Sequence, residues 1–142
     1  MARELTERTA SILDSASTWE GVCRVVRGDR RPGTTLRVGG RAFANVVDET
    51  VEAHLPGKLP RTVVAHDMAD AETGEGWTRL DLSEERRVHD AVVLLRVAYL
   101  AHVGRARRRR EDAYATVDLD PAVAELDLSP GVVHLVREQA RA

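Results

Sequence analysis

The sequence predicts a single domain of the α+β class, on three observations. A chain of 142 residues has the size of one ordinary domain. Segments with the period of amphipathic helices alternate with short β-branched segments that end at turn-rich sequence. No repeat, low-complexity tract or linker divides the chain. We therefore expect one domain over residues 1–142, with an N-terminal helix, two β-hairpins flanking an amphipathic helix, a long central helix and a short helical tail.

The first third of the chain predicts a helix and then a hairpin. Apolar residues at helical spacing predict a helix over residues 4–15. Two β-branched segments, residues 22–26 and 34–38, flank a turn-rich segment, and this order is typical of a β-hairpin. Cys23 falls within the first of these strands, so we expect a buried structural thiol.

The middle of the chain predicts a helix and then a second hairpin. Seven residues fall on one helical face before Pro56 and Gly57 would end the helix. They are Phe43, Val46, Val47, Thr50, Val51, His54 and Leu55. Residues 61–68 are expected to form a strand, joined by a loop over residues 70–76 to an alternating strand at 77–82.

A long helix is expected to dominate the second half of the chain. Ser83 can cap it, and the helical pattern continues to at least Val103 and at most Arg110. Beyond it, Asp120-Pro121 and Ser129-Pro130 each place a capping residue before a proline, which predicts two short helices.

Composition and charge exclude several classes of protein. The longest apolar run, residues 91–103, is too short to cross a bilayer and contains Arg96, so we expect no membrane span. Cys23 is the only cysteine, so neither an internal disulfide nor a cysteine-based zinc site can form within one chain. A reducing, cytoplasmic location fits this pattern best. The formal net charge of −2 gives no overall preference for a polyanionic partner.

The long helix is apolar on two opposite sides. One side carries Val88, Val92, Leu95, Tyr99 and Val103, and the other carries Val93, Val97 and Leu100. Two surfaces must cover such a helix. Either it runs through the centre of the domain, or the side with Val93, Val97 and Leu100 contacts a second copy of the chain, which would make the protein a homo-oligomer.

Two groups of arginines are candidates for binding phosphates or an acidic partner. The larger group is Arg105, Arg107, Arg108, Arg109 and Arg110, and the smaller one is Arg27, Arg30 and Arg31. Forked guanidinium groups suit phosphate contacts. The alternative for the larger group is a solvated helix end that favours the helix dipole and is neutralised by Glu111 and Asp112.

Residues 123–138 resemble a bacterial helix-turn-helix, with a short helix, a tight turn and a helix opened by Ser129. This resemblance covers the tail alone and implies contact with DNA. The turn at residues 126–128 is one residue shorter than such motifs usually have. Two capped helices with another purpose would give the same pattern.

Catalytic candidates are limited to histidines and neighbouring carboxylates. Asp67 directly follows His66, and Asp90 directly follows His89, but adjacent side chains diverge on a strand or a helix, so adjacency alone makes no site. His54 and His102 lie on apolar helical stripes, where hydrogen-bonded core histidines are expected. The sequence assigns no catalytic residue, metal ligand or cofactor.

The hypothesis that follows is a non-catalytic interaction or assembly protein that self-associates through its long helix and contacts a protein partner. One alternative is a nucleic-acid-binding regulator that uses the arginines and the tail. The other is a small enzyme, which would need His66, Asp67, His89 and Asp90 to converge on one cleft.

Overall fold

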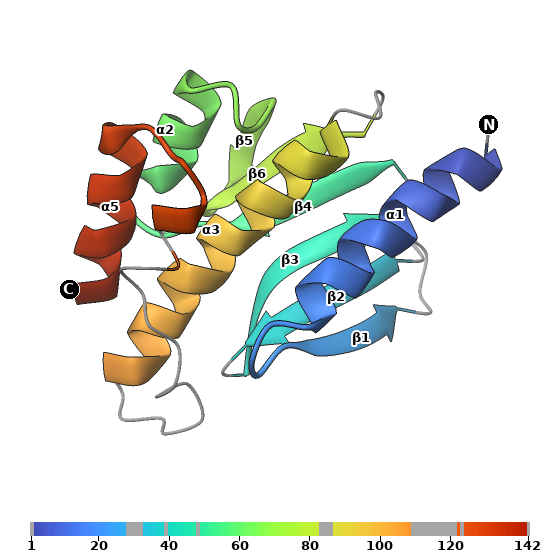
Figure 1. Ribbon diagram of the computed structural model, residues 1–142, viewed down its shortest axis with the longest axis horizontal. Coiled ribbons are helices and arrows are strands. Elements are labelled where there is room, and N and C mark those ends of the chain that lie inside the picture. The colour runs from blue at the N-terminus through green and yellow to red at the C-terminus, as the bar shows by residue number, and fades with distance from the viewer. Residues whose placement is uncertain are drawn as a thin grey trace.

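The computed structural model describes residues 2–27, 33–38, 40–47, 49–82, 87–108, 122 and 124–141. Within these residues the chain forms four helices and one six-stranded antiparallel sheet, which confirms the α+β class (Figure 1). None of the helices in the described ranges is both long and apolar enough to cross a membrane.

The sheet has the order β1-β2-β3-β4-β6-β5. Its strands are β1 (Cys23–Arg27), β2 (Gly33–Val38), β3 (Arg41–Val47), β4 (Thr50–His54), β5 (Ala71–Gly74) and β6 (Trp77–Asp81). The first four strands follow one another as a meander. The chain then passes through α2 (Leu59–Ala65) to the edge strand β5 and returns as β6 between β5 and β4. Strands β1 and β5 are therefore the two edges.

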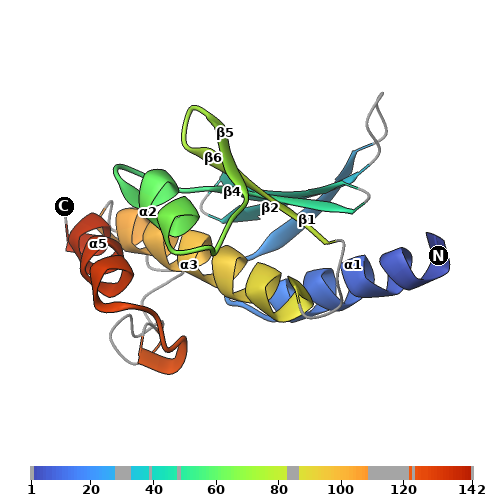
Figure 2. The same ribbon diagram turned by 90° about the horizontal axis from the view of Figure 1, so that it is seen from above.

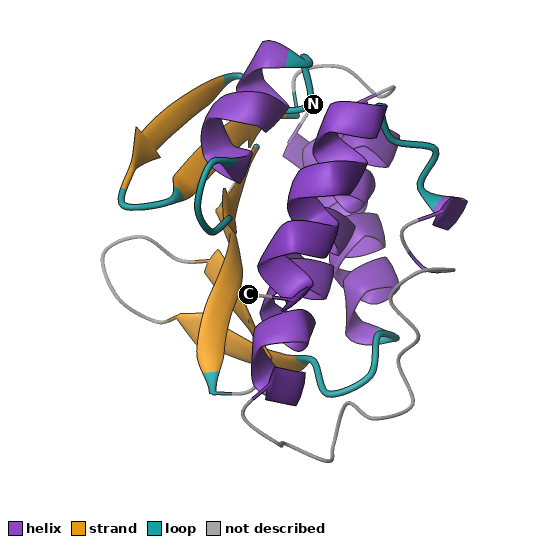
Figure 3. Ribbon diagram, turned by 90° about the vertical axis from the view of Figure 1, so that its left-hand side faces the viewer, coloured by secondary structure: helices purple, strands orange, loops and turns teal. Residues whose placement is uncertain are grey.

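The helices lie on one side of this sheet, with α3 (Arg87–Arg108) packed directly on its face (Figure 2). Helix α3 crosses strands β2, β3 and β4 and lies between α1 (Ala2–Ser17) and α5 (Pro130–Arg141). Figures 2 and 3 show these helices as a layer on one side of the strands. Helix α2 packs between α5 and strands β5 and β6. The arrangement makes α3 the centre of the domain.

The core lies between α3 and the sheet. Val46, Val51 and Leu80 form one row across β3, β4 and β6, and none is more than 2% exposed. Fully burying a side chain of this kind contributes about 1.5–3 kcal/mol to folding. On the helix side, Tyr99 is fully buried, and its hydroxyl donates a hydrogen bond of 2.6 Å to the carbonyl of Glu20, just after α1.

The predicted amphipathic helix over residues 43–55 is wrong, because this segment forms strands β3 and β4. In β4, buried Val51 and Ala53 alternate with half-buried Glu52 and His54, which is the two-residue period of a strand. The turn between the strands interrupts this period and leaves apolar residues at spacings that also fit a helix. The β-branched residues in the segment favour the strands.

The predicted strand over residues 61–68 is also wrong, because residues 59–65 form α2. Pro60 lies in the first turn of this helix, where proline is tolerated, and buried Leu59 and Val63 are four residues apart on one face. The predicted loop over residues 70–76 contains β5, which pairs with β6. The second hairpin therefore exists, but it uses β5 in place of the expected strand.

The other elements agree with the sequence analysis, with longer helices at both ends. Helix α1, the first hairpin and the long helix α3 are confirmed, and α5 follows Ser129 as expected. Residues 83–86 and 120–121, where two helix starts were predicted, lie outside the described residues. The expectation of a buried thiol at Cys23 is wrong. Cys23 lies on the edge strand β1, which has a neighbouring strand on one side only, and its side chain is exposed.

Candidate functional site

The apolar residues of α3 belong to the core of the chain itself. Val97 and Leu100, predicted to contact a second copy, are both fully buried. Neither has surface that a partner could reach in this conformation, because the sheet, α1 and α5 surround α3. Of the three predicted interface residues, Val93 alone is partly exposed. The first alternative for the long helix, a path through the centre of the domain, is the one observed.

The two arginine groups do not come together in the described part of the chain. Arg27 ends β1, and Arg105, Arg107 and Arg108 lie in the last turns of α3. Figures 1 and 2 place the end of β1 and the end of α3 at opposite ends of the molecule. Arg30, Arg31, Arg109 and Arg110 lie outside the described residues. The described backbone positions of the two groups are therefore far from one another (Figures 1 and 2).

The tail packs as part of the domain. On α5, Val132 and Val136 are buried, and the helix packs against α3 and α2. Residues 122, 124 and 125 are helical, as the predicted short helix requires. The exposed residues of α5 include both Arg137 and Glu138, and Glu138 lies 3.7 Å from His134.

His54 and His102 form a hydrogen-bonded pair; His102 is buried on a helix as expected, whereas His54 lies on strand β4 and is half-buried. Nδ1 of His54 lies 3.1 Å from Nε2 of His102, and His102 is 5% exposed. His102 Nε2 also lies 3.2 Å from the carbonyl oxygen of His54. A carbonyl can only accept, so His102 Nε2 carries a proton and His54 Nδ1 accepts. The pair joins β4 to α3 inside the fold.

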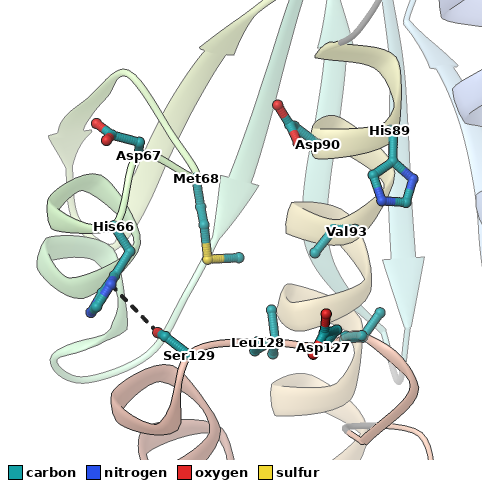
Figure 4. A pocket seen from close by; sticks show the side chains of 10 residues that line it. His66, Asp67, Met68, His89, Asp90, Val93, Asp127, Leu128 and Ser129 are labelled. Carbon is teal, nitrogen blue, oxygen red and sulfur yellow. Dashed lines mark hydrogen bonds between the residues drawn. The ribbon is translucent and has the colours of Figure 1, made fainter.

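An open cavity of about 390 Å³ lies between three segments that are distant in the sequence. One segment is residues 66–68 after α2, the second is the start of α3, and the third is residues 126–129 before α5. Its volume is within the range of small-ligand sites. His66, Asp67, His89 and Asp90, whose convergence the sequence could not decide, all line this cavity (Figure 4).

The end of α2 fixes the first wall. The amide of Asp67 donates to the carbonyl of Val64 at 3.1 Å, and the amide of Met68 donates to the carbonyl of Val63 at 2.8 Å. These two bonds define a Schellman motif, which requires a left-handed residue and usually has glycine there. Here that residue is Asp67, with φ of 58°. The motif turns the chain sharply and directs Met68 into the gap between the walls (Figure 4).

The other two walls also carry carboxylates. Asp90 is exposed in the first turn of α3, and Val93 lies near it on the same helix. Asp127 has φ of 51° and lies in the turn that leads to α5. Two of the three non-glycine residues with positive φ in the described ranges, Asp67 and Asp127, thus line one cavity.

One hydrogen bond crosses the cavity. The hydroxyl of Ser129 lies 3.4 Å from Nδ1 of His66, so the start of α5 is joined to the end of α2. A serine nucleophile needs its base at about 2.6–3.2 Å and a third group to orient the base. In Figure 4 the carboxylate of Asp67 points away from the ring of His66. The pair therefore lacks the arrangement of a catalytic serine.

The lining does not form a metal site either. In Figure 4, His66 and His89 point away from one another, on separate walls. Across the residues that the structure describes, no group of three or more histidine, cysteine, aspartate or glutamate side chains is placed to hold a metal ion. What the walls do share is negative charge without a lysine or arginine among the lining residues.

Sequence reasoning missed Met68, Asp127 and Ser129. Asp127 and Ser129 lie in the turn that the helix-turn-helix resemblance had drawn attention to, but their spatial relation to His66 depends on how α5 packs. A comparison of the chain with protein-family models, curated proteins and solved structures finds no match.

Proposed function

We propose that the protein is a cytoplasmic, non-catalytic interaction protein and that its cavity receives a basic side chain of a protein partner. The observation that carries the proposal is the lining, in which Asp67, Asp90 and Asp127 come from three walls and no lysine or arginine is present. A single exposed thiol, Cys23, supports a reducing location.

Arginine fits this lining better than a simple ion does. Met68, Val93 and Leu128 offer apolar surface for the aliphatic part of an arginine side chain, which packs on such surface while its charged end stays near water. The guanidinium group can donate paired hydrogen bonds to a carboxylate. Because Asp67 and Asp90 are exposed, the attraction is screened by salt, and one arginine alone should bind weakly.

The test uses N-acetyl-arginine amide as the probe and N-acetyl-citrulline amide as its neutral counterpart. We expect saturable NMR shift changes at residues 66–68, 89–93 and 126–129 with the arginine probe, and much smaller changes with citrulline. Binding should weaken as salt is raised. Equal shifts with both probes, or shifts spread over the whole surface, would contradict the proposal.

A variant pair makes this test specific for the cavity. Asp67→Asn with Asp90→Asn removes two carboxylates from exposed positions, so the fold should persist while the affinity for the arginine probe falls about tenfold. Glu72→Gln is the matched control, because Glu72 is exposed on β5 and does not line the cavity. If Glu72→Gln weakened binding as much as the double variant, the attraction would be to overall charge.

A further inference from the structure

The edge strand β1 exposes apolar surface on both of its faces. Val25 is 43% exposed and Val26 is 79% exposed, and they are the only large hydrophobic side chains that stand out in this way in the described part of the chain. Consecutive residues on a strand point to opposite faces. Among the described strands, β1 pairs only with β2. An open edge of this kind is a template for pairing with another strand.

We propose that β1 pairs antiparallel with β1 of a second copy of this chain, which joins the two sheets into one across a two-fold axis. The proposal goes beyond the cavity and does not depend on it. Symmetric pairing of an edge with itself closes the assembly at two copies. It would also cover the exposed valines, which contact with a small ligand at the cavity would leave open.

The register of this pairing follows from the charges of the side chains and from the face of the sheet on which each one lies. Directly opposed residues on antiparallel strands lie on the same face of the sheet. We place the two-fold axis perpendicular to the sheet at Val25, so that Val25 lies opposite Val25 of the second copy. In this register all five residues of β1 have a partner, and Arg24 lies opposite Val26. Moving the axis to Arg24 would place two arginines opposite each other, which is unfavourable.

The sequence around β1 is complementary to itself in this orientation. Glu20 precedes the strand, and Arg27 ends it. Antiparallel pairing brings the acidic end of one copy beside the basic end of the other. Arg24 lies 3.7 Å from Asp14 of α1 and, in this register, faces the uncharged Val26 of the second copy. The aliphatic part of Arg24 can then cover Val26 of the second copy.

The first experiment measures the molar mass of the full chain by sedimentation velocity from low to high micromolar concentration. We expect a dimer that dissociates on dilution. Val25→Lys and Val26→Lys should each raise the dissociation constant about tenfold or more, because each places a cation opposite another cation. Glu72→Lys on the β5 edge is the control and should leave the dimer intact. A monomer at every concentration, or a dimer unaffected by either valine variant, would overturn the proposal.

The second experiment tests the register with cysteines. In a Cys23→Ser background, Val25→Cys places two thiols opposite each other, within the span of a disulfide, so mild oxidation should give a covalent dimer. In the unaltered chain, the two Cys23 residues would be offset by four residues, or about 13 Å along the strand, and should not cross-link. Cross-linking through Cys23 but not through Val25→Cys would overturn this register, and circular dichroism confirms that each variant is folded.

Discussion

The β1 and β5 edges bound the same sheet, but they differ in exposure and in regularity. At β1, a regular strand of five residues exposes Val25 and Val26. At β5, a strand of four residues has a register shift between Glu72 and Gly74, and α2 packs against it. Short, irregular and covered edges resist pairing with other chains. The difference indicates that β5 is protected against strand addition and that β1 is available for it.

An ion pair further secures the β5 edge. Both terminal guanidinium nitrogens of Arg87 donate to the carboxylate of Asp70 at 2.8 Å, and one of them, Nη1, also donates to the carbonyl of Asp81 at 2.9 Å. The amide of Asp81 donates to the same carboxylate at 2.8 Å. These bonds hold the start of β5, the end of β6 and the start of α3 together. On β1 the ion pair between Arg24 and Asp14 is longer, at 3.7 Å, and both of its side chains are exposed.

The sharpest contrast is between the apolar edge and the apolar centre. Leu100→Asp should destabilise the protein by about 4 kcal/mol or more and prevent folding, because it buries an unpaired charge. Val26→Asp should change the stability of the monomer by less than about 0.5 kcal/mol. Urea denaturation measures both. A Leu100→Asp variant that is stable and monomeric would show that α3, and not β1, contacts the second copy.

The ion pair between Arg87 and Asp70 should stabilise the β5 edge. Arg87→Gln should lower the free energy of unfolding by about 1–2 kcal/mol, because charge-assisted hydrogen bonds are lost but the site is partly exposed. Arg79→Gln is the control, since Arg79 and Asp81 are half-exposed and 3.9 Å apart, and it should cost less than about 0.5 kcal/mol. Equal losses of stability in the two variants, measured by thermal melts, would show that the Arg87–Asp70 pair contributes no more than an ordinary surface ion pair.

The same ion pair gives the β5 edge a dependence on acid. Hydrogen bonds from Arg87 hold the pKa of Asp70 below its ordinary value of 3.8, and this effect outweighs the opposing effect of burial. A lowered pKa in the folded state stabilises the protein above the unfolded pKa, and this stabilisation is lost as pH falls through the folded pKa. Asp70→Asn should therefore be less stable than the unaltered chain at neutral pH, and the difference should shrink below about pH 4. A constant difference from neutral to acid pH in urea titrations would contradict this.

Local patterns predicted those elements whose sequence fits one structure only. Helix α1 and the β1–β2 hairpin have periods and turns with a single interpretation. The segment around Val47 and Thr50 satisfies both a helical and a strand period, so tertiary pairing decides it. The exposure of Cys23 and the burial of Leu100 depend on the order of strands in the sheet, which no local pattern contains.

The cavity could be predicted in part. The pairs His66–Asp67 and His89–Asp90 have the residue types of a binding site, but one pair ends α2 and the other begins α3. Only the packing of α5 against both α2 and α3 brings them together with Asp127. Asp67 occupies a left-handed position after α2 that usually favours glycine, and this becomes visible only once α2 is known to be a helix.

The smallest effect is expected at Asp67, which follows α2, the helix packed against the β5 edge. Asp67→Gly should stabilise the protein by roughly 0.5–1 kcal/mol, because glycine adopts the left-handed conformation without strain. Asp67→Ala, which has neither this freedom nor the tolerance of aspartate, should destabilise it. If the carboxylate serves binding, Asp67→Gly should also bind N-acetyl-arginine amide more weakly while unfolding at a higher urea concentration. A glycine variant that is more stable and binds equally well would leave Asp67 without a role in the cavity, whereas opposite changes in stability and affinity are expected when a residue is retained for binding at the expense of the fold.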